Sequence, residues 1–257
     1  MKHFVLVHGI CHGAWCWYKV VALLKSAGHS VSPLDLGASG INPKKIGELT
    51  SMSDYAQPLM EFIASLPQEE KVVLVGHSFG GISISLAMER YPQKILAGVY
   101  LTAFMPNHDS SPGTRVQEFF NGVMEESTMD FQLSFDDGPE NPPTGALFGP
   151  NYMLAKVYQL SPKEDIELAK TVLRPGKWFM KDLSKESLLT KDKFGSVNRV
   201  YIVCQDDLLI KERLQKWYIE HNPTGDVKVI AGADHMPMFS KPNEVFKCLQ
   251  EIAEKYN

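Results

Sequence analysis

Short runs of apolar residues alternate along the chain with longer segments in which apolar residues recur every three or four positions. The short runs are rich in Val, Ile, Leu and Tyr and end at turn residues, as buried strands do. They cover residues 4–7, 31–34, 72–75, 96–101, 200–204 and 227–230. The longer segments have helical spacing and cover residues 17–27, 52–65, 82–91, 212–220 and 244–256. Because strands that alternate with helices form parallel sheets through right-handed crossovers, the pattern predicts an α/β fold with a mostly parallel sheet and helices on both faces.

The alternation is interrupted between residues 106 and 190. This stretch contains helix-like pieces, aromatic residues and clusters of turn residues such as 136–139, but no convincing alternating strand. We therefore expect a single domain over residues 1–257, with a core of residues 1–105 and 191–257 and a helical cap insertion of about residues 106–190. A long excursion from a regular α/β fold usually serves a site, so the cap is expected over the carboxyl ends of the strands. A second helical layer with no contact to the site is the alternative.

Composition and charge restrict the classes of partner. Of the 257 residues, 26 are Lys or Arg and 30 are Asp or Glu, which gives a formal net charge of -4 and predicts no nucleic-acid partner. The longest apolar stretch, residues 95–105, is shorter than the ~20 residues of a membrane helix, so no membrane association is expected. No secretory signal is visible at the start of the chain. The four cysteines lack metal-ligand spacing and fit free thiols in the cytoplasm, with a Cys11–Cys16 disulfide as the alternative, and no metal is expected.

The most informative motif is Gly-x-Ser-x-Gly at residues 76–80, which follows one apolar run directly and precedes a helical segment directly. A serine at a sharp strand-to-helix turn has a strained backbone, and glycines two positions before and after it avoid steric conflict with the crossing chain. The motif in this context predicts the α/β-hydrolase fold with Ser78 as nucleophile. A tight turn with an incidental serine is the alternative, but it does not explain why strand, glycines and helix coincide.

Two backbone N–H groups are predicted to stabilise the negative charge that develops when Ser78 attacks a carbonyl. Phe79 N–H is at the start of the helical segment, where free N–H groups and the helix dipole favour an anion. The second donor is expected from the glycine-rich loop after the first strand, where Ile10 N–H is the candidate and Gly9 keeps the backbone close to the attacked group. A plain strand-ending turn is the alternative for this loop.

A serine nucleophile needs a base, normally histidine, that is itself held by a carboxylate. Only His221 and His235 follow the late strands, and His221 falls near the end of a helical segment, so His235 is the predicted base. The acid is expected one strand earlier, where position in the loop favours Asp207 over Asp206. Asp234 is assigned to turn structure, because neighbouring residues rarely present their side chains to one another.

Several further segments carry a family signal, namely residues 3–9, 11–15, 27–29, 76–78, 173–176, 195–197 and 232–236. Through these segments, and along essentially the whole chain, the sequence resembles the plant methylesterase and hydroxynitrile lyase family of α/β-hydrolases. The resemblance implies that Ser78, Asp207 and His235 form the catalytic triad, which decides the choice of acid. It also implies that Ile10 and Phe79 supply the oxyanion donors.

The resemblance implies a serine carboxylesterase that hydrolyses small methyl esters of plant hormones or alkaloids through an acyl-enzyme intermediate, without a cofactor. The lyase branch has a threonine where this chain has Gly9 and a lysine where it has Met236. Both are absent here, so Gly9 and Met236 are expected to set the reaction type in favour of ester hydrolysis. A hydroxynitrile lyase and a small-molecule receptor with a hydrolase fold are the alternative functions.

The expected partner is therefore a small-molecule ester, and the sequence leaves a homodimer open. Residues 107–129 depart from the methylesterases, and an aromatic residue expected near Thr128 is missing. A preference for salicylate is for that reason not predicted.

Overall fold

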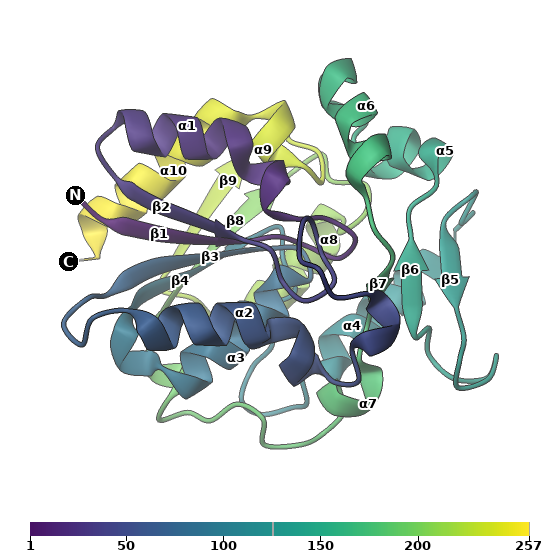
Figure 1. The fold of residues 1–257 in the computed structure, drawn as a ribbon, viewed down its shortest axis with the longest axis horizontal. Helices are drawn as coiled ribbons and strands as arrows, with labels where there is room; N and C mark the ends of the chain where they lie inside the picture. The colour runs from purple at the N-terminus through teal and green to yellow at the C-terminus, as the bar shows by residue number, and fades with distance from the viewer. Residues whose placement is uncertain (125, 257) are drawn as a thin grey trace.

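A six-stranded parallel sheet forms the centre of the molecule, with strand order β2-β1-β3-β4-β8-β9 (Figure 1). The structure is a computed structural model that describes residues 1–124 and 126–256. The strands are β1 (His3–Val7), β2 (Ser30–Leu34), β3 (Val72–His77), β4 (Ile95–Leu101), β8 (Asn198–Cys204) and β9 (Asp226–Ile230). Each pairing in this sheet is parallel, so the carboxyl ends of the strands meet at one edge, as the alternation of strand and helix predicts.

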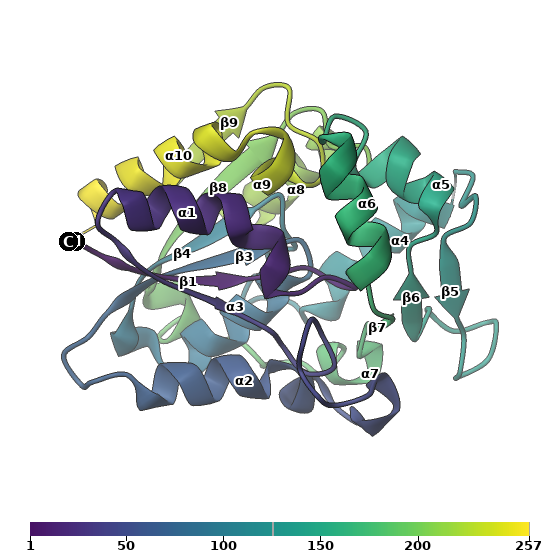
Figure 2. The same cartoon turned by 45° about the horizontal axis from the view of Figure 1, so that its top comes forward.

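Helices cover both faces of the sheet (Figures 1 and 2). The principal ones are α1 (Tyr18–Ser26), α2 (Met52–Ser65), α3 (Gly80–Arg90), α8 (Glu212–His221) and α10 (Pro242–Lys255). Short helical turns are η1 (Ala14–Trp17), η2 (Ile46–Glu48), η3 (Pro92–Lys94), η5 (Phe194–Ser196) and α9 (Pro237–Ser240). Figure 2 shows α1 and α10 side by side on one face and α2 and α3 on the opposite face. Within residues 1–124 and 126–256, no helix is both long and apolar enough to cross a membrane.

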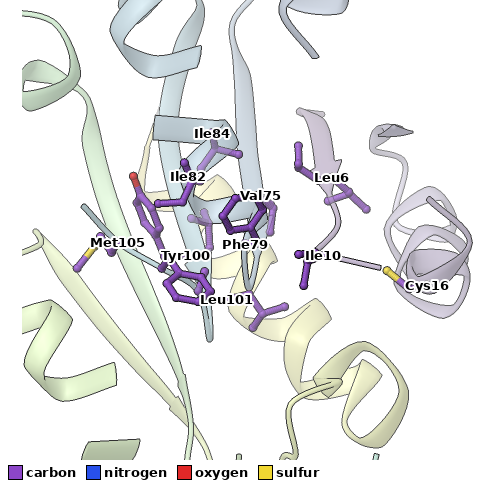
Figure 3. Packing of buried hydrophobic residues seen from close by; sticks show 14 of the residues in the cluster. Leu6, Ile10, Cys16, Val75, Phe79, Ile82, Ile84, Tyr100, Leu101 and Met105 are labelled. Carbon is purple, nitrogen blue, oxygen red and sulfur yellow. The ribbon is translucent and has the colours of Figure 1, made fainter. Parts of the chain in front are cut away.

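The hydrophobic core explains why the strands read as continuous apolar runs. All six residues of β3 are buried, because helices cover both faces of the sheet at its centre. Figure 3 shows Val75 of β3 between Leu6 of β1 and Ile82 of α3, and all three side chains are fully buried. Burying an aliphatic side chain of this size contributes about 1.5–3 kcal/mol, so this packing holds the loops at the strand ends in place. The four cysteines of the described chain are free thiols.

The cap segment, our name for residues 106–190, follows β4 and precedes β8. Its elements are α4 (Gly113–Met124), β5 (Gln132–Ser134), β6 (Gly145–Leu147), α5 (Pro150–Tyr152), the π-helical turn η4 (Met153–Val157), α6 (Lys163–Val172), β7 (Gly176–Lys177) and α7 (Met180–Leu183). Strands β5, β6 and β7 form a small antiparallel sheet beside the helices of the cap segment, and this sheet was not predicted from the sequence. Strands of two or three residues are too short to show a period-two pattern, so the sequence analysis could not detect them.

The cap segment lies beyond the carboxyl ends of the central strands (Figure 1) and is hydrogen-bonded to the loops there. The Arg174 guanidinium donates to the backbone oxygens of Gly40, Asn42 and Lys44 at 3.1, 2.7 and 2.7 Å. Lys177 Nζ donates to the backbone oxygen of Leu49 at 2.9 Å. These contacts fix the cap segment against the loop that follows β2.

Candidate active site

Ser78 occupies the sharp turn between β3 and α3 with a left-handed backbone, φ 53°. A non-glycine residue in this region stores about 1–3 kcal/mol of strain, which the surrounding structure must hold. The two glycines of the motif make the turn sterically feasible. A Cβ at Gly76 would lie 2.8 Å from the carbonyl oxygen of Gly80, and a Cβ at Gly80 would lie 2.6 Å from that of His8. The motif therefore places Ser78 at the end of the strand for the steric reason that its spacing suggested.

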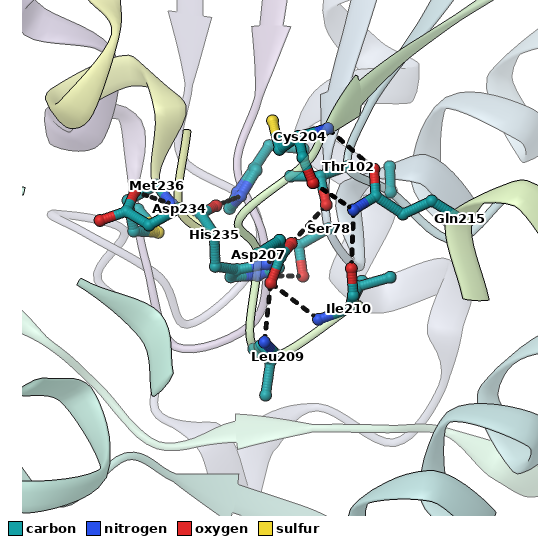
Figure 4. Close-up of polar contacts among 12 residues, drawn as sticks. Ser78, Thr102, Cys204, Asp207, Leu209, Ile210, Gln215, Asp234, His235 and Met236 are labelled. Atoms are coloured by element: carbon teal, nitrogen blue, oxygen red, sulfur yellow. Dashed lines mark hydrogen bonds and ion pairs between the residues drawn. The ribbon is translucent and has the colours of Figure 1, made fainter. Parts of the chain in front are cut away.

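Loops after β8 and β9 bring two further side chains to Ser78 (Figure 4). His235 Nε2 lies 3.1 Å from Ser78 Oγ, and His235 Nδ1 lies 2.7 Å from Asp207 Oδ2. All three side chains are buried. An ionised carboxylate only accepts hydrogen bonds, so we assign the imidazole proton to Nδ1, which leaves the Nε2 lone pair facing the serine hydroxyl. This is the arrangement that a general base requires.

The Asp207 carboxylate is held by four donors (Figure 4). Oδ1 accepts from the backbone N–H groups of Leu209 and Ile210 at 2.7 and 2.9 Å. Oδ2 accepts from His235 Nδ1 and from Thr102 Oγ1, the latter at 2.5 Å. Because each oxygen has two donors, the side chain has one orientation and its buried charge is solvated by the protein.

Thr102 and Gln215 were not recognised in the sequence, although both organise the loop of Asp207. Gln215 is buried on α8; its Oε1 accepts from Cys204 N at 3.0 Å, and its Nε2 donates to the oxygens of Cys204 and Ile210 at 2.9 and 2.7 Å. Gln215 thereby ties the start of this loop to its end. The available signal for Thr102 was a polar residue directly after a buried strand, whereas Gln215 had no signal beyond its helical position.

The alternative acid and base lie elsewhere. Asp206 is exposed, and its Oδ2 accepts from the backbone N–H of Gly232 at 2.8 Å. His221 is exposed at the end of α8, where its Nδ1 lies 2.8 Å from the oxygen of Trp217. Of these two side chains, neither contacts His235 in the described structure.

Asp234 connects the loop of His235 to the cap segment. Its Oδ1 accepts from Met236 N and Ser240 Oγ at 2.9 and 2.8 Å, which stabilises the turn expected here. Its Oδ2 accepts from Leu160 N and Ser161 Oγ at 2.9 and 2.8 Å. Burial raises the pKa of Asp234, while these hydrogen bonds oppose the shift.

Two buried histidines orient the loop that carries Ile10. The His8 Nε2 accepts from Leu36 N at 3.1 Å, so its Nδ1 bears the proton and donates to the Gly9 oxygen at 2.7 Å. The His12 ring lies 2.8 Å from the Ile10 oxygen and 2.6 Å from the hydroxyl of Tyr158 in the cap segment. Since the Gly9 carbonyl and the Ile10 N–H belong to one planar peptide, holding the carbonyl also aims the N–H in the opposite direction.

Phe79 follows Ser78 and precedes the first residue of α3. The first N–H groups of a helix have no partner within the helix, so Phe79 N–H is available to an anion beside Ser78. The ring of Phe79 contacts Trp178 of the cap segment and Phe104, with centroid distances of 5.3 and 6.1 Å. An aromatic side chain of the cap segment thus contacts the residue next to Ser78.

Gly9 and Met236 lie beside Ser78 and His235, respectively. A Cβ at Gly9 would lie 2.7 Å from Ser78 Cβ and 3.2 Å from Ser78 Oγ, closer than side chains normally approach. Met236 is fully buried beside His235 and brings no charge to it. The space next to Ser78 therefore depends on the missing side chain at position 9.

The sheet, the strand-end loops and the serine turn together define a hydrolase. Residues 4–247 match the Alpha/beta hydrolase family, and the chain belongs to this family. Methyl jasmonate esterase 1 of Vitis vinifera is 53% identical over 257 residues, which cover 100% of this chain and 98% of that protein. The resemblance to plant methylesterases inferred from the sequence is confirmed.

Two solved structures are also similar over the full length. Tomato Methylketone Synthase I, in a complex with beta-ketoheptanoate, superposes with a TM-score of 0.92 at 47% identity and covers 100% of this chain and 98% of its own. Polyneuridine aldehyde esterase, known from Rauvolfia serpentina, superposes with a TM-score of 0.91 at 46% identity and covers 98% of this chain and 99% of its own. The fold is accordingly the α/β-hydrolase fold, as predicted.

Proposed function

We propose that the protein is a serine carboxylesterase of small methyl esters, with Ser78 as nucleophile, His235 as general base and Asp207 as the acid that orients the histidine. One observation carries the proposal, the hydrogen-bond chain from Ser78 Oγ through the His235 ring to Asp207, at 3.1 and 2.7 Å. The names of two relatives, methyl jasmonate esterase and polyneuridine aldehyde esterase, support a methyl ester as substrate.

The reaction follows from the proton positions. Ser78 Oγ attacks the ester carbonyl carbon while His235 Nε2 takes the hydroxyl proton, and the carbonyl oxygen becomes an oxyanion. Ile10 N–H and Phe79 N–H donate to this oxyanion. Methanol leaves with the proton from His235, and the acyl group remains on Ser78. Water then attacks the acyl-enzyme with His235 as base, which releases the acid and restores the serine.

Gly9 and Met236 favour hydrolysis over the lyase reaction in this proposal. Gly9 leaves space beside Ser78 for the ester carbonyl group. Met236 places no positive charge beside His235 that could stabilise a departing cyanide. The uncharged side chain at position 236 also supports the role of His235 as a base, because a cation there would oppose protonation of the histidine.

The cap segment is proposed to cover the acyl side of the site, above a core of residues 1–105 and 191–257 in one domain. The contact of Trp178 with Phe79, at 5.3 Å between ring centroids, supports this arrangement. Apolar aromatic groups at this position fit an uncharged, apolar acyl group. We further propose a cytoplasmic location, because buried free thiols fit a reducing compartment.

The proposal is tested by measuring methanol release from a panel of methyl esters with the purified protein, with Ser78→Ala as the matched control. We expect sustained turnover of at least one ester by the wild type and none by the variant. The panel should include mandelonitrile, with cyanide as the readout, and a β-keto acid, with carbon dioxide as the readout. Release of cyanide or carbon dioxide without ester turnover would contradict the proposal, and binding without turnover would favour a receptor.

A further inference from the structure

Thr102 is a strained residue in a buried position next to the acid. It directly follows β4 with φ 37°, a left-handed conformation that a β-branched residue adopts only when its surroundings enforce it. Its side chain is fully buried, and its backbone N–H donates to Ile202 of the neighbouring strand β8 at 3.0 Å. Strain of this kind clusters at functional sites, so the contacts of the side chain are informative.

The Thr102 hydroxyl shares one oxygen with the histidine. Thr102 Oγ1 lies 2.5 Å from Asp207 Oδ2, and His235 Nδ1 lies 2.7 Å from the same oxygen (Figure 4). An ionised carboxylate has no proton to give, so the hydroxyl is the donor. Two donors therefore compete for the negative charge of Oδ2.

We propose that Thr102 is a positioning residue that extends the working range of the esterase toward acid pH. By donating to Oδ2 of Asp207, its hydroxyl withdraws negative charge that would otherwise stabilise protonated His235. Asp207 therefore stabilises a protonated His235 less than a carboxylate without this hydrogen bond would. The inference rests on the proposed function, since it concerns the same acid and base.

Other ionisable side chains near Asp207 and His235 do not account for a pH dependence of this kind. Those that interact with this pair electrostatically are His12, His77, Tyr152, Tyr201, Cys204 and Tyr218. His8 interacts with His12 and His77, and Asp234 is the neighbour of His235 in the chain. Burial lowers the pKa of His12 to about 3 and holds that of His77 well below its ordinary value, so both rings are neutral. Burial also lowers the pKa of His8 and raises those of the tyrosines and the cysteine, which stay uncharged as well.

Asp234 is the carboxyl group in this set. Its oxygens accept from Leu160, Ser161, Met236 and Ser240, none of which contacts Thr102 through a described hydrogen bond. Any titration of Asp234 is therefore the same whether or not position 102 carries a hydroxyl. A difference between variants at position 102 reports on Asp207 and His235.

The test compares Thr102→Ser with Thr102→Ala, which differ only in the hydroxyl. Both lack the branched methyl group, so both reduce the strain of the left-handed backbone and are expected to fold. The measurement is kcat/KM for a methyl ester across the acidic limb of the pH profile. We expect Thr102→Ser to keep the wild-type midpoint and Thr102→Ala to move it upward by about one pH unit, equivalent to an about tenfold loss of kcat/KM below the midpoint.

Equal midpoints in the two variants, or a downward shift in Thr102→Ala, would overturn the inference. A lower melting temperature of Thr102→Ala with an unchanged midpoint would have the same meaning, because it shows a purely structural residue. An NMR titration of the His235 ring in both variants needs no substrate. It tests Thr102 even if the protein hydrolyses no methyl ester, so failure of this inference is distinguishable from failure of the proposed function.

Discussion

The substitution Gly9→Ala introduces the smallest side chain, a single Cβ, at position 9. That atom would lie 2.7 Å from Ser78 Cβ, 3.2 Å from Ser78 Oγ and 3.2 Å from His77 Nδ1. Ordinary contact begins at 3.4 Å, so the loop of Gly9 and the serine turn must separate by about 0.7 Å. Neither side gives way easily, since Ser78 is held in a strained turn and the Gly9 carbonyl is held by His8.

A separation of this size acts on the proposed oxyanion donors, because Ile10 N–H belongs to the peptide that starts at Gly9. A displacement of about 1 Å of a reacting group can cost about 10²-fold in rate, and loss of one oxyanion donor costs about 10²–10³-fold. We therefore expect Gly9→Ala to lower kcat/KM for methyl esters by about 10- to 100-fold, or about 1.4–2.7 kcal/mol of transition-state stabilisation. Gly9→Thr, which adds a branch and a hydroxyl at the same place, should lose more.

The assay is methanol release at subsaturating ester, with Gly47→Ala as the matched control. A Cβ at Gly47 meets nothing within 4 Å, so this variant makes the same chemical change where space is open. Melting temperatures of both proteins show whether a loss reflects unfolding. If Gly9→Ala hydrolyses esters as fast as Gly47→Ala, the loop does not form part of the oxyanion site and the steric reasoning is refuted.

Three further predictions concern the proposed nucleophile, the proposed acid and the residue that supports the loop of the acid. Ser78→Ala should abolish ester turnover with an unchanged melting temperature, because it removes only the attacking oxygen; retained turnover would contradict the triad. Asp207→Asn should lower kcat about 10⁴-fold, as the corresponding change does in serine proteases, whereas Asp206→Asn should have almost no effect. The reverse result would show that Asp206 is the acid. Gln215→Leu leaves the buried Cys204 N–H without its described acceptor and removes the amide that donates to the oxygens of Cys204 and Ile210. The variant should lower the free energy of unfolding by about 1–3 kcal/mol, measured by urea denaturation. An unchanged midpoint would show that this amide does not support the loop.

The central fold could be predicted because its signals are local. The run of residues 72–75 is apolar throughout, and the structure extends it to β3 (Val72–His77). The helical spacing of residues 244–256 corresponds to α10 (Pro242–Lys255), whose buried residues recur every three or four positions. The small sheet of β5, β6 and β7 could not be predicted, because its strands have only two or three residues and so show no period-two pattern.

The candidate site residues also divide into those with a local sequence signal and those without one. Ser78 is marked by its neighbours in the chain, and the candidates Asp207 and His235 by their place after late strands. The hydrogen bond from Thr102 to Asp207 joins residues that are 105 positions apart, so no local sequence pattern predicts it. It depends on two neighbouring strands, β4 and β8, which end side by side in the folded sheet.

The anchoring of residues 160 and 161 on Asp234 limits how this enzyme can be redesigned. Leu160 N and Ser161 Oγ donate to a buried carboxylate whose neighbour in the chain is His235. A cap segment transplanted from a relative would have to supply both donors at this place. Each hydrogen bond that a buried carboxylate loses costs at least about 1–3 kcal/mol of stability. Substrate specificity therefore cannot be transferred by exchanging the cap segment alone. Exchanges confined to cap side chains that face the site, with this junction kept, are the changes this architecture tolerates.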